Sequence, residues 1–211
     1  MKLGDIKIEA LKLMFVSYGE FLTTDSLPNY ENDENYASYL VKMNGSINRC
    51  FADLERKRIT PTRVKILSAE DAKNRACNAE FDISALDMLE LVRLDYENER
   101  GVRVSPFRVY EYIPEEKRLI TRKISDGECY HLVYREKLKR LGYDEANELE
   151  IELPDTITSV IPFFIKGDLF REDEPNEAAE ARNWYEQATE DIINSEQSGG
   201  EVASVFSLSD V

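Results

Sequence analysis

The chain has 211 residues, of which 42% are hydrophobic and 33% charged, and its formal net charge is −15 at pH 7. This length and composition suit one large globular domain or two small ones. General nucleic-acid binding requires a basic surface that displaces counterions from phosphates, so the negative charge argues against that function. The charge is uneven: residues 168–211 carry twelve acidic and two basic residues, whereas residues 1–70 carry ten of each.

The N-terminal part of the chain predicts two helices. A first helix is expected from Gly4 to about Tyr18, with Asp5 as its N-cap. From Asp33 onward, apolar residues recur at spacings of three and four, which predicts a long helix that ends before Pro61. The apolar seam of this helix consists of Tyr36, Leu40, Met43, Ile47, Cys50 and Leu54.

The centre of the chain favours short β-strands. β-Branched and aromatic residues gather in runs that turn-forming sequences separate. These runs are residues 64–67, 102–104, 107–112, 118–121 and 131–134, with turns at 113–117 and 125–128. We expect an antiparallel meander. Residues 82–94 fit either a short helix or the start of a strand.

The block from residue 153 to residue 193 predicts a compact helical hairpin. Its first helix runs from Ile157 to about Phe170, with Pro162 either in the first turn or at a kink. Its second helix begins near Pro175, because proline suits the first helical position. Trp184 and Tyr185 are expected to supply most of the buried area of this second helix and to extend the helix-packing seam.

Together these elements predict an α+β fold, in which a helical bundle made by the N-terminal and C-terminal helices carries an inserted small antiparallel β domain. The bundle covers residues 1–61 and 151–194, the β-rich insertion covers 62–150, and a flexible tail covers 195–211. The tail combines a Ser-Gly-Gly linker with apolar residues too few to form a core. It is either a disordered end or a peptide that docks on a partner.

The candidate catalytic pair is Cys129 and His131, the single histidine. In a strand these side chains share one face, but Cα atoms ~7 Å apart leave them too distant for a good direct hydrogen bond. No third, orienting group can be located, and a half-buried strand histidine is the preferred interpretation. Cys50, Cys77 and Cys129 form no CxxC pair, so we expect reduced thiols and neither a disulfide framework nor a zinc finger.

Other motifs for chemistry are missing from the sequence. The acidic groups near residues 25–34 and 172–174 do not follow the spacing of a calcium loop, and they fall at expected helix starts, where acids are common. No Gly-rich phosphate loop, GxSxG elbow or HExxH motif is present. We therefore expect a protein without enzyme activity, cofactor or metal site.

Three segments carry a resemblance to a known family: residues 3–6 leading into the first helix, residues 48–54 at the end of the long helix, and elements between residues 153 and 186. Together they cover about half of the chain. They resemble the head-to-tail connector (adaptor) proteins of tailed bacteriophages. The central β region, residues 62–150, departs from the shortest members of that family.

The resemblance implies a virion protein of the phage neck. Family members assemble, usually as twelve copies, into a ring beneath the portal protein, and DNA passes through the lumen without sequence-specific binding. The helical bundle makes the ring, and the next tail or neck component binds below it. A C-terminal extension commonly clasps the portal, which assigns portal docking here to Val205, Phe206, Leu208 and Val211.

Two alternatives belong to other classes of protein. An acidic inhibitor that mimics DNA and binds a host nucleic-acid enzyme would also explain the charge of −15. An enzyme using Cys129 and His131 would require a thiol with a lowered pKa. No run approaches the roughly 18 apolar residues of a membrane span, so we expect synthesis in the host cytoplasm and no membrane partner.

Overall fold

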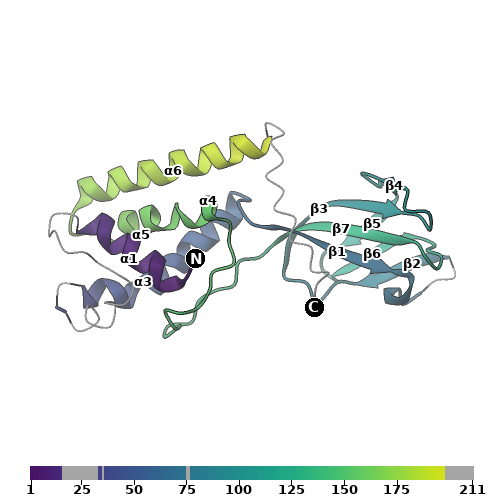
Figure 1. Ribbon diagram of the computed structural model, residues 1–211, viewed down its shortest axis with the longest axis horizontal. Coiled ribbons are helices and arrows are strands. Elements are labelled where there is room, and N and C mark those ends of the chain that lie inside the picture. Colours follow the sequence, from purple (N-terminus) through teal and green to yellow (C-terminus); the bar gives the residue numbers. More distant parts are fainter. Residues whose placement is uncertain (16–32, 35, 75–76, 198–211) are drawn as a thin grey trace. The chain divides into compact units, whose positions relative to one another are not determined.

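The structure, a computed structural model, describes residues 1–15, 33–34, 36–74 and 77–197 (Figure 1). These residues form an α+β protein with helices and two antiparallel sheets. The chain divides into two compact units. The helical unit draws on Met1–Ile59 and on the chain from Leu138 through the last helix, and the β unit comprises Thr60–Lys137. Residues 138–150, which the sequence assigned to the β-rich insertion, group with the helices.

The helical unit follows the periodicity of the sequence, except that the first helix ends at Met14, short of the expected Tyr18, and that the chain differs near Pro162. A proline lacks the N–H that a helix interior needs, so it is tolerated in a first turn. Pro162 lies in the first turn of its helix, and the single helix expected from Ile157 to Phe170 is split into a short helix and a longer one. The helices are α1 (Leu3–Met14), α3 (Ala37–Arg56), α4 (Asp155–Thr158), α5 (Ile161–Leu169) and α6 (Pro175–Gln197).

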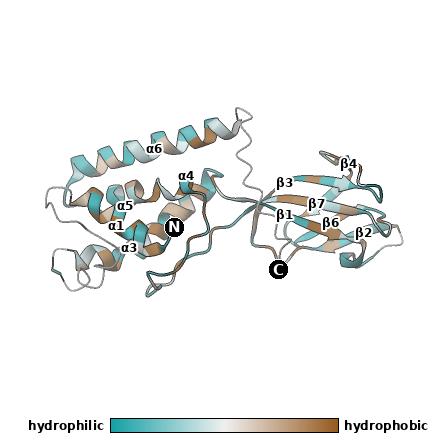
Figure 2. Cartoon of the chain, in the orientation of Figure 1, coloured by the Kyte–Doolittle hydropathy of each residue, from teal (hydrophilic) through white to brown (hydrophobic). Residues whose placement is uncertain are grey.

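Helix α5 is the centre of the helical unit, because it contacts α1, α3 and α6. Its residues Ile161 and Ile165 are fully buried, as are Ile6 of α1 and Ile47 of α3. Gly167 allows α6 to approach closely: a Cβ at this position would lie 3.2 Å from the carbonyl oxygen of Ala178. Figure 2 shows that hydrophilic residues cover much of α6, whose exposed side is charged.

The start of α1 is held by a distant segment of the same unit. The N–H groups of Leu3 and Gly4 donate to the carbonyl oxygens of Leu149 and Asn147, both at 2.8 Å. Asp5 is therefore not the N-cap that the sequence predicted. It is the third residue of the helix, where its carboxylate accepts the N–H of Lys2 at 3.1 Å.

The β unit contains two sheets, with strand orders β1-β7-β3-β4 and β2-β6-β5. The expected meander is wrong for the larger sheet, because β7 pairs with β1 and β3 rather than with its neighbours in sequence. The ambiguous stretch 82–94 contributes most of a long strand, β3. The strands are β1 (Thr62–Ser68), β2 (Asn78–Asp82), β3 (Met88–Glu97), β4 (Arg103–Val104), β5 (Tyr110–Ile113), β6 (Arg118–Arg122) and β7 (Cys129–Glu136), and a 3-10 turn, η3 (Ala69–Asp71), follows β1.

One core lies between the two sheets. Tyr130 and Leu132 of β7 and Leu94 of β3 are fully buried, as are Phe81 of β2 and Leu119 of β6. Successive side chains of a strand point to opposite faces. Residues at alternate positions of β3 and β7, among them Glu97, Cys129 and His131, therefore lie on the opposite face of the larger sheet.

Candidate functional site

The predicted helix-packing seam is buried along α3. Met43, Ile47 and Leu54 are fully buried, and Tyr36 and Leu40 are no more than 8% exposed. On α6 the two aromatic neighbours differ: Tyr185 is fully buried, whereas Trp184 is 55% exposed. Adjacent helical residues point about 100° apart, so a single buried stripe holds only one of them. The prediction that Trp184 packs into the seam is thus wrong.

The predicted portal-docking residues lie outside the described part of the chain. They are Val205, Phe206, Leu208 and Val211.

A buried polar cluster joins α3 to α6. The hydroxyl of Tyr185 donates to Asp53 Oδ2 at 2.8 Å, and Lys57 Nζ lies 3.4 Å from the same oxygen and 4.5 Å from the Tyr185 ring centroid. Burial would raise the pKa of Asp53, but the hydrogen bond from Tyr185 and the charge of Lys57 bring it below its ordinary value. Burial, with nearby Cys50 and Asp53, raises the pKa of Tyr185. This cluster is a structural contact that sequence periodicity did not identify.

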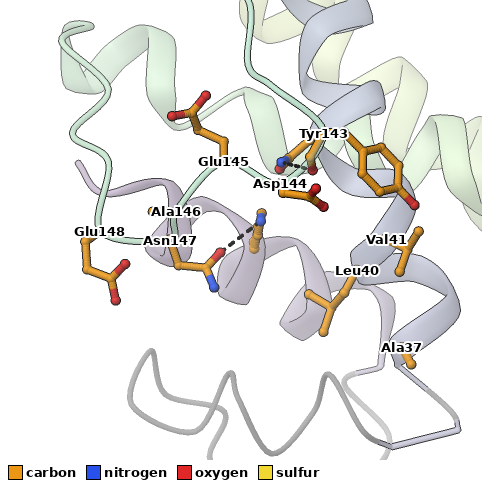
Figure 3. Close-up of a pocket in the computed structure, with 11 residues that line it drawn as sticks. Ala37, Leu40, Val41, Tyr143, Asp144, Glu145, Ala146, Asn147 and Glu148 are labelled. Atoms are coloured by element: carbon orange, nitrogen blue, oxygen red, sulfur yellow. Dashed lines mark hydrogen bonds between the residues drawn. The ribbon is translucent and has the colours of Figure 1, made fainter.

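A groove in the helical unit lies between α1, α3 and the segment 143–148 (Figure 3). Its volume is about 460 Å³. Two side chains hold the segment in place: Asn44 Nδ2 donates to the carbonyl oxygens of Gly142 and Tyr143 at 3.0 Å, and Lys7 Nζ donates to Asn147 Oδ1 at 2.8 Å. Both Asn44 and Lys7 are buried, and the rest of the lining includes acidic residues. These are Asp144, Glu145 and Glu148.

The groove is a feature of packing that the sequence did not indicate. Asn48, one turn after Asn44 on α3, donates to the carbonyl of Leu141 at 2.9 Å and accepts its N–H at 2.8 Å. Asparagines at this spacing share one helix face. In the sequence, Asn44 and Asn48 are a polar pair at positions i and i+4 beside an apolar seam. An ordinary solvent-exposed helix face shows the same pattern, so the pair did not indicate a groove.

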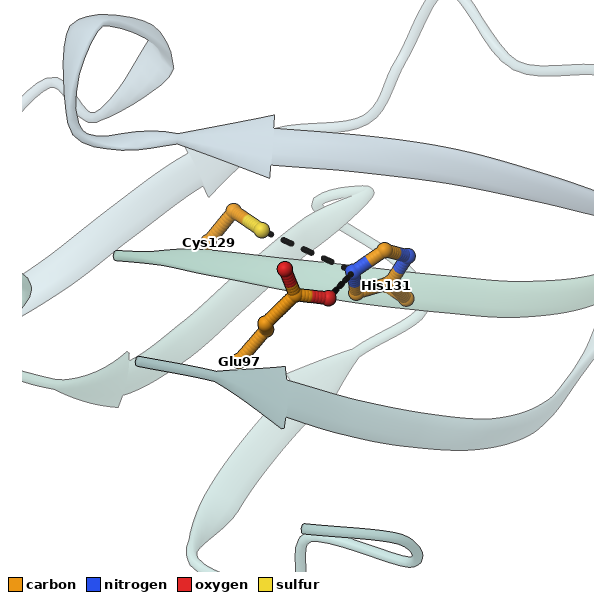
Figure 4. Close-up of side chains that lie close together, drawn as sticks. All are labelled: Glu97, Cys129 and His131. Carbon is orange, nitrogen blue, oxygen red and sulfur yellow. Dashed lines mark hydrogen bonds and ion pairs between the residues drawn. The ribbon is translucent and has the colours of Figure 1, made fainter. Parts of the chain in front are cut away.

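A second candidate site lies on the larger sheet of the β unit, where three potential ligand side chains converge (Figure 4). Cys129 and His131 project from one face of β7, and Glu97 of β3 is the direct cross-strand partner of Cys129. His131 Nε2 lies 3.5 Å from Cys129 Sγ and 3.0 Å from Glu97 Oε2. The expectation that the first two side chains stay apart is wrong, because they lean toward each other along the strand.

Sequence reasoning also missed Glu97, the third group of this cluster. Its partner strand β7 begins more than thirty residues later, as the separation of 34 between Glu97 and His131 indicates. Only the register of β3 against β7 brings them together. No local pattern could have placed a glutamate beside this histidine.

The cluster is poorly suited to nucleophilic catalysis by a thiolate. Burial, together with the negative charge of Glu97, raises the pKa of Cys129, although Arg103 opposes this shift. A reactive thiol requires the reverse, a lowered pKa. Cys129 is therefore a protonated thiol at neutral pH when no metal ion is bound.

A network of buried charge lies beside the cluster on the same sheet face. Asp95, whose side chain is fully buried, is the cross-strand partner of His131. Its carboxylate accepts hydrogen bonds from Arg103 Nη2 and Ser105 Oγ at 2.6 Å and from Arg93 Nε at 3.2 Å. Burial would raise the pKa of Asp95, but these donors lower it below the ordinary value.

Comparisons of the chain with models of known protein families and with curated proteins found no match. Within the described residues, no helix is long and apolar enough to cross a membrane.

Proposed function

We propose that the chain is a structural protein of the neck of a tailed-bacteriophage virion, where a ring of copies joins the portal to the tail and lets DNA pass. The observation that supports this best is the packing of the three segments that resemble connector proteins. The start of the chain, α3 and the closing helices α5 and α6 are distant in sequence, yet they share one hydrophobic core. In this proposal the helices form the ring-making bundle, and twelve copies follow from the family resemblance.

The charge of the last helix agrees with passage of DNA. Among the α6 side chains whose exposure is described, Glu177, Glu180, Glu190 and Asp191 are exposed acids, and Arg182 is an exposed base. Carboxylates repel the phosphate backbone, so an acidic lining would let a duplex slide without gripping it. An acidic helix on the ring therefore supports the proposed role.

The exposed Trp184 supplies a candidate contact between neighbouring subunits. It is 55% exposed on an otherwise polar helix surface. Tryptophan is the residue type that most often anchors protein interfaces, because it buries a large rigid area. In the proposed ring, Trp184 packs against a second copy of the chain.

Ring assembly is tested by light scattering coupled to size exclusion and by negative-stain electron microscopy, with the protein alone and mixed with the portal protein of the same genome. We expect rings that extend the portal along its axis. Trp184→Ala should weaken association by about 30-fold, the size of a typical hot-spot loss of about 2 kcal/mol. Asn176→Ala, at an exposed position in the first turn of α6, is the matched control and should assemble normally.

Portal docking is tested with two double substitutions in the tail. Phe206→Ala with Leu208→Ala removes apolar side chains, whereas Ser207→Ala with Ser209→Ala changes alternate positions of the same segment. We expect only the first pair to abolish retention of the protein by immobilised portal. Equal retention of both variants would contradict the docking assignment.

The same experiments also test the alternative function, an acidic inhibitor that mimics DNA. Such an inhibitor would remain monomeric beside unchanged portals and would bind a basic nucleic-acid enzyme with strong salt dependence. Association through apolar contacts is far less sensitive to salt. A monomer at all protein concentrations, with no portal binding, would therefore overturn the connector proposal.

A further inference from the structure

We propose that Glu97, Cys129 and His131 form a zinc-binding site on the larger sheet of the β unit. Their ligand atoms, a carboxylate oxygen, a thiol sulfur and an imidazole nitrogen, all lie within 4.8 Å of one another. These are the three ligand types that zinc takes in proteins. The inference stands apart from the proposed assembly role, and its test does not depend on that role.

Two of the three ligand separations are close to those of a tetrahedral zinc site. Zn–S bonds of ~2.3 Å and Zn–N bonds of ~2.0 Å place sulfur and nitrogen ~3.5 Å apart, and nitrogen and oxygen ligands ~3.3 Å apart. The observed separations are 3.5 Å between Cys129 Sγ and His131 Nε2, and 3.0 Å between that nitrogen and Glu97 Oε2. The third pair, Cys129 Sγ and a Glu97 carboxylate oxygen, lies within 4.8 Å, so adjustment of the Glu97 side chain would bring all three atoms to the spacing of a zinc site.

Hydrogen bonding within the cluster leaves the Cys129 sulfur with only a weak contact. Both contacts use one atom, His131 Nε2, as Figure 4 shows. A proton on this nitrogen is donated to Glu97, and the same N–H gives Cys129 Sγ, a weak acceptor, only a shared contact at 3.5 Å. A cation bound by all three atoms would give the sulfur a full ligand bond.

The scaffold is also suited to a metal site. Cys129 and His131 are fixed at positions i and i+2 of β7, and Glu97 lies directly across from Cys129 on β3. Sites on strands hold their ligands more rigidly than sites on loops. The His131 side chain is 13% exposed and that of Glu97 is 33% exposed, so the cluster is partly buried yet open to an ion from solvent.

The ligand set selects the metal. Calcium and magnesium prefer oxygen ligands, whereas one sulfur and one nitrogen among three ligands favour zinc. Binding releases the Cys129 thiol proton to solvent, and the resulting thiolate and carboxylate neutralise the two charges of Zn²⁺. The carboxylate of the neighbouring Asp95 is engaged by Arg103, Arg93 and Ser105. A water molecule would be the fourth ligand, as in other zinc sites with three protein ligands.

The test uses the full chain, reduced and stripped of metal with a chelator, then titrated with Co²⁺ as a spectroscopic substitute for zinc. We expect one equivalent to bind with a thiolate-to-cobalt charge-transfer band and visible bands of tetrahedral cobalt, both displaced by one equivalent of Zn²⁺. Loss of a residue that only hydrogen-bonds to a metal ligand weakens metal sites by about 10–100-fold. Loss of a ligand itself costs more, so Cys129→Ser should lower affinity by about 100-fold or more and abolish the thiolate band.

Cys77→Ser is the matched control, because Cys77 is an exposed free cysteine of the same unit. It should leave both the band and the affinity unchanged. His131→Asn is a second test that keeps the thiol and should weaken binding as strongly. Far-ultraviolet circular dichroism establishes that each variant is folded, and Zn²⁺ should raise the Tm of the wild type but not that of folded Cys129→Ser.

Three outcomes would overturn the inference. They are no stoichiometric cobalt binding by the wild type, binding without a thiolate band, and a thiolate band that is lost with Cys77→Ser but kept with Cys129→Ser. If Cys129→Ser does not fold, the same comparison is made between His131→Asn and the wild type, and unchanged affinity there would equally refute the site.

Discussion

Tyr185→Phe provides the sharpest test of how α6 is held on α3. The substitution keeps the ring, which packs edge-on against Phe164 with centroids 5.1 Å apart and lies 4.5 Å from Lys57 Nζ. It removes only the hydroxyl that donates to Asp53 Oδ2 at 2.8 Å. The measured loss therefore separates the contacts of one hydroxyl, which include a hydrogen bond with the buried Cys50 thiol, from the apolar packing.

The expected loss of stability on Tyr185→Phe depends on the surroundings of Asp53. A hydrogen bond to a charged group contributes about 1.5–3 kcal/mol. The Asp53 side chain is 10% exposed, and Lys57 Nζ, which the substitution does not touch, lies 3.4 Å from its Oδ2. Since the carboxylate keeps an ionic partner, we expect the lower part of that range, a loss of about 2 kcal/mol in the free energy of unfolding.

The assay is urea denaturation at pH 7, followed by the fluorescence of Trp184, the single tryptophan, which reports on α6. Tyr143→Phe removes a hydroxyl from a residue that is 73% exposed and should change stability by less than about 0.5 kcal/mol. A double-mutant cycle with Asp53→Asn should return a coupling energy of about 1.5 kcal/mol or more. A loss equal to that of the control, or a coupling near zero, would refute the reasoning.

Two further predictions concern backbone approach and buried charge. Gly167→Ala should destabilise the helical unit by about 1–3 kcal/mol in urea denaturation, because its Cβ would lie 3.2 Å from a backbone carbonyl of α6. Gly45→Ala is the control at an exposed position of α3, and it should stabilise the unit by up to about 1 kcal/mol. Asp95→Asn should lower the free energy of unfolding by about 1.5–3 kcal/mol at pH 7, followed by the circular dichroism of the β unit. The loss is no larger because the partners Arg93 and Arg103 are half-exposed and solvent partly screens their charges. The folded-state pKa of Asp95 lies below the ordinary 3.8, so this difference is fully present above pH 3.8 and shrinks as the pH falls through the folded-state pKa. Equal stability of both glycine variants, or an Asp95→Asn deficit that grows in acid, would contradict these predictions.

Local patterns in the sequence identified most of the secondary structure. The seam from Tyr36 to Leu54 predicted α3, and Pro175 marked the start of α6. The turn at 125–128 is present, with Gly127 at a φ of +85° and a hydrogen bond from the Glu128 N–H to the Ser125 carbonyl. Such features depend on residues a few positions apart, and for that reason the sequence alone is sufficient to predict them.

The predictions from sequence failed where a residue's environment depended on a second, distant segment of the chain. Asp5 is not an N-cap because the carbonyls of Asn147 and Leu149 accept the first N–H groups of α1. Trp184 is exposed although its neighbour Tyr185 is buried, since only the face of α6 that meets α3 and α5 enters the core. Burial of a given aromatic residue is a property of the partner surface as well as of the helix.

The amino-acid sequence by itself determined the mixed α+β composition, the long helices and the acidic C-terminal part of the chain. The tertiary structure alone decided the strand order of the larger sheet and the convergence of Glu97 with Cys129 and His131. Helical periodicity is encoded within a few turns, whereas strand pairing closes loops of tens of residues and is selected by the packing of the whole core. The candidate zinc ligands therefore become visible only once β3 and β7 lie side by side.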